Sequence, residues 1–369
     1  CTIAERIANV LNKNVLILEK RNHLGGNCYS YKDENNIIVH KYGPHLFHTD
    51  SKKVFDYLSN FTEWQEYVHR VLGFIDGKKV PIPVNINTIY ELFPADTANS
   101  LKIKLLNKYD YGSRIPILEL FKETDPDLNF FANFIYDKVY KNYTQKQWGY
   151  KPEEINFEVT ARVPVYISND NRYFTDKYQK VPLEGYTKLI ERMLYHPRIR
   201  VMLRTNFRSL LKMDYTTGNI YFMGEEYKGK LIFTGQIDEL FDFKYGCLPY
   251  RGLDLKFETI EHEYYQEAPV VNYPNDYEFT RITEFKHIHY VKSANTIILK
   301  EYPKNYQTHK DIPYYPVLQK VSQDLYGRYK EEADRYSNLI LLGRLAEYKY
   351  YDMDDAVKRS LDIFEEKIK

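Results

Sequence analysis

Three arginines stand beside aromatic or small side chains in segments of moderate charge: Arg162 in TARVPV, Arg281 in FTRITEFKH and Arg344 in GRLAEY. A guanidinium group binds phosphate oxygens through paired hydrogen bonds, and tyrosine hydroxyls add donors without adding charge. Each arginine taken alone fits a surface ion pair better. Two or three of them together with tyrosines, of which the chain has 37, would suit a diphosphate. The pattern therefore predicts a phosphorylated ligand.

A second group of residues has the spacing of a dinucleotide-binding fold. The apolar run VLIL at residues 15–18 predicts a buried strand, and Glu19 ends it where such folds carry an acid for the ribose hydroxyls. Arg21, Gly25 and Gly26 follow in a stretch that resembles the R-x-x-x-G-G of many flavoproteins, which predicts contact with a flavin nucleotide. The glycine-rich pyrophosphate turn stands about 20 residues before the acid in these folds. We therefore expect that turn ahead of residue 1.

The stretch GRLAEYKYYDMDDAV near the end of the chain has a related pattern. An apolar strand ends at Gly343 and Arg344, and Asp352 precedes a predicted helix. Flavoproteins commonly close the flavin site with such a turn and with a helix whose positive end faces the flavin ring. An ordinary strand-to-helix turn capped by Asp352 is the alternative.

Other chemistries find little support in the sequence. His45, His48 and His69 lack the carboxylate or thiolate neighbours of a typical metal centre, so we expect no metal. A G-x-S-x-G nucleophile turn is absent, and three scattered cysteines fit a reducing cytoplasm rather than a disulfide framework. Lys and Arg total 52 against 51 for Asp and Glu. That balance predicts no nucleic-acid binding. The lack of any apolar run of about 20 residues predicts no membrane insertion.

The hydrophobic periodicity predicts an α/β protein with a helical insertion and an antiparallel sheet. Helical spacing covers residues 3–11, 52–60, 185–194 and most of 86–148, and a hairpin with an Asp-Gly tip covers 70–84. The predicted domains are interleaved: a Rossmann-like flavin-binding domain of residues 1–60, 183–245 and 335–369, a helical domain of residues 86–150, and an antiparallel substrate sheet of residues 61–85, 151–182 and 246–334.

Longer motifs are more specific. They occur in order across essentially the whole chain: HKYGPHLFHT, NYTQKQWG, VPLEGYTKLIERML, LIFTGQIDELFDFKYGCLPYRGL, FTRITEFKH, KEYP, YYPV and GRLAEYKYYDMDDAV. In these motifs the chain resembles the bacterial UDP-galactopyranose mutases. Stretches such as YTQKQWG and GRLAEYKYYDM are not general flavoprotein patterns, so the resemblance is to this family and goes beyond a shared fold.

The resemblance implies a noncovalently bound FAD, active when reduced, and interconversion of UDP-galactopyranose with UDP-galactofuranose. In the family mechanism N5 of the reduced flavin attacks the anomeric carbon and expels UDP, so the protein positions the substrate and stabilises charge. The leaving diphosphate accounts for the arginines. The resemblance also implies a homodimer in the cytoplasm.

The resemblance further implies roles for individual residues. The expected catalytic residues are Arg162 on a mobile loop, a fixed Arg281 and His48 beside the flavin. The expected substrate-binding residues are Tyr143, which would stack on uracil, Thr144 and Trp148 on the uridine side, the phosphate-binding Tyr173, Tyr315 and Tyr350, and Asn272. The expected cofactor-binding residues are Glu19, Arg21, Gly25, Gly26, Asn27, His45, Gly343, Arg344, Asp352 and Met353.

Two features depart from the family pattern. The spacing between Asn272 and Arg281 differs slightly, and the opening strand with its G-x-G-x-x-G turn is missing, so we expect a chain that begins at Cys1 to bind FAD poorly or fold badly. Three alternatives stay open: a mutase acting on UDP-N-acetylgalactosamine, a flavin-dependent oxidoreductase of amine-oxidase type, and a non-catalytic remnant.

Overall fold

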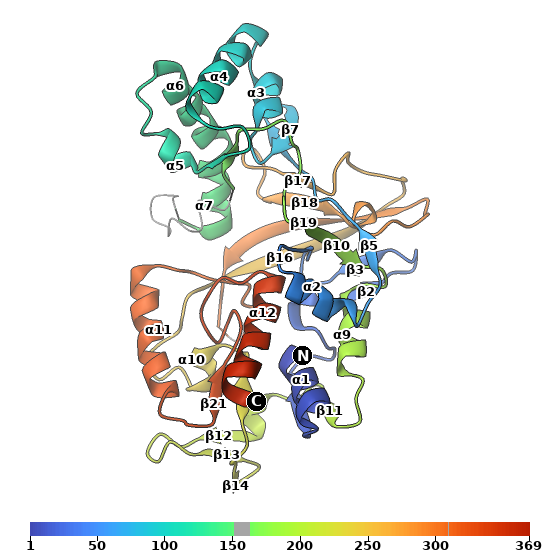
Figure 1. The fold of residues 1–369 in the computed structure, drawn as a ribbon, viewed down its shortest axis with the longest axis vertical. Helices are drawn as coiled ribbons and strands as arrows, with labels where there is room; N and C mark the ends of the chain where they lie inside the picture. The colour runs from blue at the N-terminus through green and yellow to red at the C-terminus, as the bar shows by residue number, and fades with distance from the viewer. Residues whose placement is uncertain (151–162, 309) are drawn as a thin grey trace.

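A seven-stranded sheet crosses the middle of the molecule, between a group of helices at one end and the elements near both chain termini at the other (Figure 1). The computed structural model describes residues 1–150, 163–308 and 310–369. The strand order is β20-β16-β19-β18-β17-β6-β7. The strands are β6 (Val71–Ile75), β7 (Lys78–Ile82), β16 (Tyr250–Ile260), β17 (Val270–Asn272), β18 (Arg281–Glu284), β19 (Thr296–Asn305) and β20 (Tyr315–Pro316).

This sheet confirms the predicted antiparallel architecture with one exception. Every neighbouring pair is antiparallel apart from β17 and β6, which run parallel. The β6–β7 hairpin turns at Asp76 and Gly77, both of which have positive φ, as its Asp-Gly tip predicts. The hairpin therefore extends the sheet at the edge nearest the helical group.

The helical group is formed by residues 86–148, as the apolar spacing predicts. Its elements are α3 (Ile86–Leu92), α4 (Ala95–Lys108), α5 (Ile117–Leu120), α6 (Pro126–Ile135), the π-helical turn η2 (Tyr136–Lys141) and α7 (Asn142–Trp148). Asn85 caps α3 in a reciprocal pair with Thr88, and Asp125 caps α6 ahead of Pro126. The short strands β8 (Arg114–Ile115) and β9 (Val165–Tyr166) pair beside them. Helix α7 ends this group at the face of the sheet (Figure 1).

The opposite end has a Rossmann-like arrangement of parallel strand pairs and helices. Strand β1 (Val15–Leu18) pairs with β11 (Ile199–Met202), and β15 (Leu231–Phe233) pairs with β21 (Leu339–Leu341), both in parallel. The helices are α1 (Thr2–Leu11), α2 (Lys52–Ser59), α9 (Tyr186–Leu194), α10 (Ile237–Leu240), α11 (Lys320–Ala333) and α12 (Met353–Ile363). Helix α11 was not anticipated from the sequence, and it packs into the apolar cluster that contains β15 and α10.

The prediction of a fully buried strand at β1 is wrong. Leu16 is 44% exposed, whereas Val15 and Ile17 pack against α1 and β11. Alternate side chains of a strand point to opposite faces, so the face that carries Leu16 is open at that residue, while Leu18 on the same face is half-buried by the described residues.

The remaining elements are short and surround these units. They are η1 (Gly26–Cys28), β2 (Ser30–Lys32), β3 (Ile38–His40), β4 (Phe47–Thr49), β5 (Trp64–Glu66), β10 (Tyr178–Pro182), η4 (Phe207–Ser209), β12 (Leu211–Met213), β13 (Ile220–Phe222), β14 (Glu225–Glu226), η5 (Phe285–His287) and η6 (Phe364–Ile368). Strand β10 lies between β4 and β5 and carries the chain back toward α9.

Candidate active site

Three polar side chains form a row across the central sheet. Asn272 is the cross-strand partner of Arg281, and Arg281 is the partner of Glu301, so all three lie on one face. Arg281 Nε lies 2.8 Å from Glu301 Oε1, and the Glu301 side chain is fully buried. Burial lowers the pKa of Arg281, but the Glu301 carboxylate more than offsets this and holds that pKa well above its ordinary value. The guanidinium is thus a fixed cation.

An aromatic wall with a second arginine lies beside this row. The rings of Tyr315 and Tyr350 are stacked 5.7 Å apart, and the Arg344 guanidinium lies 5.3 Å and 5.0 Å from their centroids. Arg344 donates hydrogen bonds to the carbonyls of Tyr314, at 3.2 Å, and Tyr351, at 2.5 Å. These carbonyls hold the guanidinium against the tyrosine faces.

Helix α7 brings two of the predicted uridine contacts to the same place. The Trp148 ring lies 5.8 Å from the Tyr315 ring. Burial raises the pKa of Tyr143, whose hydroxyl interacts with the charges of Arg281 and Glu301 and with Tyr173. Thr144 is half-buried on the same helix. The Tyr173 backbone N–H donates to the carbonyl of His69, 2.9 Å away.

The loop between β3 and β4 supplies His45, and strand β4 supplies His48. Burial lowers the pKa of His45 to about 4, helped by the nearby charges of Arg344 and Arg281, so this imidazole is neutral. His48 Nδ1 lies 3.2 Å from Asp176 Oδ2, and its ring stacks on Phe174 at 3.6 Å. Burial opposes protonation of His48, but the Asp176 carboxylate outweighs it and raises the His48 pKa.

The residues predicted to bind the adenosine part of a cofactor also form one cluster. Glu19 Oε1 accepts a hydrogen bond from the Arg21 backbone N–H at 2.8 Å, and Arg21 Nη2 donates to Asn27 Oδ1 at 2.9 Å. Arg21 Nη1 is buried, and it has no hydrogen-bond partner among the residues that the structure describes. Gly25 and Gly26 have φ of +88° and +55°, and no atom lies within 4 Å of the position of a Gly26 Cβ. An open turn and an unsatisfied cationic donor are features suited to an anionic ligand.

The late motif forms the predicted turn and helix start. Gly343 has a φ of +94°, and its N–H donates to Glu347 Oε2 at 2.8 Å. Asp352 is the N-cap residue of α12, and Met353 is the first residue of that helix. The charge of Asp352 acts on His48, so the start of α12 lies near strand β4.

Sequence reasoning missed several residues that hold this site in place. Glu301, Asp176 and Phe174 support Arg281 or His48 as described above. Two buried histidines, His40 and His289, also lie behind the β3–β4 loop. The backbone N–H of His45 donates to His40 Nδ1, and His40 Nε2 lies 3.0 Å from His289 Nε2. Of these residues, only Glu301 had a signal in the sequence. In TIILKEY it lies two positions after Leu299, on the same strand face as that apolar residue, which indicates burial.

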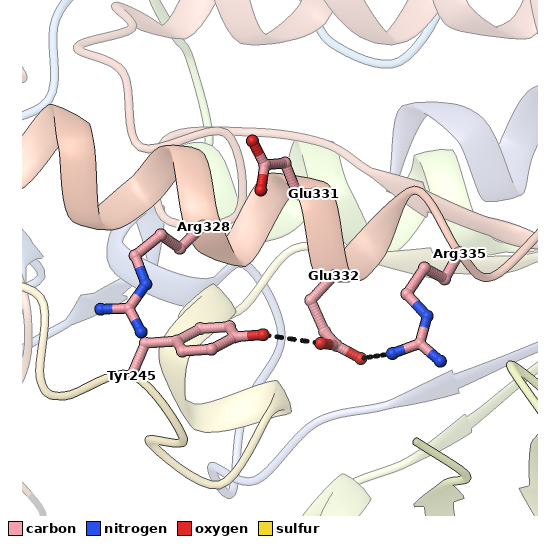
Figure 2. Close-up of a pocket in the computed structure, with 5 residues that line it drawn as sticks. All are labelled: Tyr245, Arg328, Glu331, Glu332 and Arg335. Carbon is pink, nitrogen blue, oxygen red and sulfur yellow. Dashed lines mark hydrogen bonds and ion pairs between the residues drawn. The ribbon is translucent and has the colours of Figure 1, made fainter. Parts of the chain in front are cut away.

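Arg162 lies outside the described residues, so its predicted role is not tested here. A separate pocket of about 230 Å³ lies on α11 and is shown in Figure 2; it is lined by Tyr245, Arg328, Glu331, Glu332 and Arg335. Glu332 accepts hydrogen bonds from Tyr245 at 2.8 Å and from Arg335 at 3.0 Å. These groups satisfy one another, and the pocket contains none of the predicted site residues.

Comparison with known proteins identifies the family. The model of the UDP-galactopyranose mutase family (GLF) matches residues 138–350, and an NAD(P)-binding Rossmann-like domain model matches residues 1–61. The chain is 34% identical to the dTDP-fucopyranose mutase of Escherichia coli, over 98% of this chain and 93% of that protein. It is also 34% identical to the UDP-galactopyranose mutase of Mycoplasma genitalium, over 96% and 90% of the two chains. The chain belongs to the UDP-galactopyranose mutase family.

Membership of this family makes the chain a nucleotide-sugar mutase, an isomerase. A crystal structure of reduced UDP-galactopyranose mutase is similar over 99% of this chain and 90% of that one, with a TM-score of 0.72 and 16% identity. A redesigned putrescine oxidase is similar with a TM-score of 0.56 and 9% identity, over 98% and 97%. At these identities the likeness shows the fold alone, and it confirms the predicted α/β fold with a Rossmann-like domain.

Two negative observations apply to the residues that the structure describes. None of their helices is both long and apolar enough to cross a membrane. No group of three or more His, Cys, Asp or Glu side chains among them is arranged to hold a metal ion.

Proposed function

We propose that this family member interconverts UDP-galactopyranose and UDP-galactofuranose with the help of reduced FAD. The observation that carries the proposal is the group formed by Arg281, Arg344, Tyr143 and Tyr315: two fixed guanidinium groups beside tyrosines. A diphosphate leaving group needs fixed positive charge and hydroxyl donors.

The residues around Glu19 fit the nucleotide part of FAD. The unsatisfied Arg21 Nη1 and the open position at Gly26 suit its phosphates, and Glu19 suits a ribose hydroxyl. In the proposal His45, Arg344 and the start of α12 lie around the flavin ring. The reduced flavin, when bound, supplies the nucleophile for the anomeric carbon.

The protein's own residues then have binding and electrostatic roles. Arg281 stabilises the charge that develops on the diphosphate as the bond to the anomeric carbon breaks, and Tyr315 and Tyr350 donate hydrogen bonds to its oxygens. Tyr143, Thr144 and Trp148 hold the uridine, Tyr173 joins Tyr315 and Tyr350 at the phosphates, and Asn272 lies near the substrate. His48 and Arg162 keep their predicted roles beside the flavin and on the diphosphate.

A dTDP-6-deoxysugar is the second candidate substrate, because the E. coli relative at 34% identity is named a dTDP-fucopyranose mutase. UDP-N-acetylgalactosamine is a third. A homodimer in the cytoplasm belongs to the proposal as well, and sedimentation equilibrium would measure the mass of the assembly.

The deciding experiment measures anaerobic turnover of each furanose form by dithionite-reduced protein with added FAD, separating substrate and product by chromatography. We expect the highest kcat/KM with UDP-galactofuranose and a large loss in the Arg281→Met variant. Faster turnover of dTDP-fucofuranose would replace the proposed substrate. Net oxidation of an amine with oxygen consumption, and no isomerisation, would favour an oxidoreductase instead.

A further inference from the structure

Arg251 is a buried arginine that binds the C-terminal end of helix α7. Its Nε donates to the carbonyl of Gln147 at 2.9 Å and its Nη2 to the carbonyl of Lys146 at 3.1 Å, while Nη1 donates to Asn305 Oδ1. The residue is only 4% exposed. The last carbonyls of a helix lack partners within the helix and carry its negative dipole end. Arg251 satisfies two of them from the neighbouring sheet.

The end of α7 is shaped to receive this guanidinium. Gly149 is the C-cap residue, with a φ of +76°. A Cβ on Gly149 would stand 2.9 Å from Arg251 Nη1, too close for a real contact. Glycine therefore permits both the left-handed backbone and the close approach of the arginine.

The same contact fixes the position of an aromatic side chain in the candidate site. Trp148 directly follows the two carbonyls that Arg251 binds, and its ring packs against Tyr315 at 5.8 Å. Tyr315 is the cross-strand partner of Arg251 in the β16–β20 pair. Arg251 thus connects the strand pair that holds Tyr315 to the helix end that holds Trp148.

Helix α7 also has an attachment that does not involve Arg251. Lys146 Nζ donates to the carbonyls of Tyr273 at 3.0 Å and Asn275 at 3.3 Å. Loss of Arg251 should therefore leave α7 attached to the sheet while its C-terminal end moves. Such a change would alter the placement of Trp148 more than the fold.

We propose that Arg251 is a positioning residue for the nucleoside-binding part of the site, acting through the end of α7 and Trp148. The inference rests on the proposed function. Arg251 has no contact in this role with the sugar or the flavin; it sets the position of Trp148, which holds the uridine, relative to Tyr315, which donates to the diphosphate.

The test uses the FAD-loaded protein in a Trp64→Phe background, which leaves Trp148 as the single tryptophan of two. We compare Arg251→Met, Arg251→Lys and the control Arg328→Met, since Arg328 packs on Tyr245 and not on α7. In Arg251→Met we expect greater acrylamide quenching of Trp148 and about a tenfold increase in the Kd for UDP and in KM, because small displacements of binding groups have large effects. Flavin content and kcat should change less than about threefold. Arg251→Lys should recover part of the loss, and Arg328→Met should match the parent protein.

Unchanged Trp148 quenching and unchanged UDP affinity in Arg251→Met would overturn the inference, as would a fall in kcat with KM unchanged. If Arg251→Met does not fold, Gly149→Ala perturbs the same contact from the helix side and should raise Trp148 quenching and KM in the same direction; parent values there would also overturn it.

If no nucleotide sugar is isomerised by the parent protein, the proposed function fails, while the quenching comparison still decides whether Arg251 positions Trp148.

Discussion

Replacing Glu301 with Gln should lower the free energy of unfolding by about 2 kcal/mol. The carboxylate is fully buried and is ion-paired to the Arg281 Nε at 2.8 Å, while the Arg281 side chain is 25% exposed. Removing one partner of a buried pair typically costs about 3–5 kcal/mol. Glutamine keeps a hydrogen-bond acceptor, and partial exposure lets water stabilise the remaining cation, so the expected loss lies below that range.

The assay is urea unfolding of the FAD-loaded protein at pH 7 in low and high salt. A matched control is Glu258→Gln, because Glu258 pairs with Lys300, the residue before Glu301, at 2.8 Å on the surface. That exposed pair should contribute less than about 0.5 kcal/mol and should weaken further with salt. The Glu301→Gln loss should persist in high salt. Equal stability of the two variants would refute the view that the buried Glu301 carboxylate stabilises the fold through its ion pair with Arg281.

Three further predictions concern the cofactor cluster and the histidines. Arg21→Met should lower FAD retention about tenfold, measured by flavin absorbance after gel filtration, and leave the Kd for UDP unchanged. Asp176→Asn should reduce stability at pH 5.5 but not at pH 8, because the raised His48 pKa gives stability that is present below about pH 6.5 and is lost as pH rises through the folded value. Burial lowers the pKa of His69 to about 3 and of His289 to about 4, so urea stability should fall as pH drops from about 6.5 toward 4, and His289→Gln should reduce that slope.

The first helix and the β6–β7 hairpin could be predicted from the sequence because the patterns that indicate them span only a few neighbouring residues. The helical spacing of residues 2–11 and the Asp-Gly tip of the β6–β7 hairpin depend on neighbours within a few positions. The burial of β1 could not be inferred in this way, because the exposure of Leu16 depends on which distant elements pack on each face of the strand. An apolar run predicts a strand, but the packing of helices and other layers onto the sheet decides whether both of its faces are covered.

In the candidate site, too, residues within motifs could be predicted from the sequence, but contacts between residues far apart in the chain could not. Arg281 and Tyr315 could be selected from motifs, since side-chain type and motif context are local. Their partners could not: Glu301 meets Arg281 through the register of β18 and β19, and Arg251 meets the end of α7 from about 100 residues away in sequence. Such contacts depend on strand register and helix docking, which no short pattern encodes.

The three described arginines near the site differ in what holds them, and this has an electrostatic consequence. Arg281 is held by a carboxylate, so the pair together carries little net charge. Arg344 and Arg251 are held by carbonyls, with an amide in addition for Arg251, so each keeps its full positive charge. The positive charge of Arg251 is directed at the negative end of the α7 dipole. Arg344 is therefore the stronger source of positive electrostatic potential in the site before the reaction begins. A cation that is already compensated by a carboxylate attracts the ground-state diphosphate less strongly than an uncompensated one, so Arg344 should contribute more to binding of the diphosphate than Arg281 does. Arg344→Met should therefore raise the Kd for UDP more than Arg281→Met does, as measured by titration of the FAD-loaded protein; an equal or larger increase in Arg281→Met would contradict this assignment.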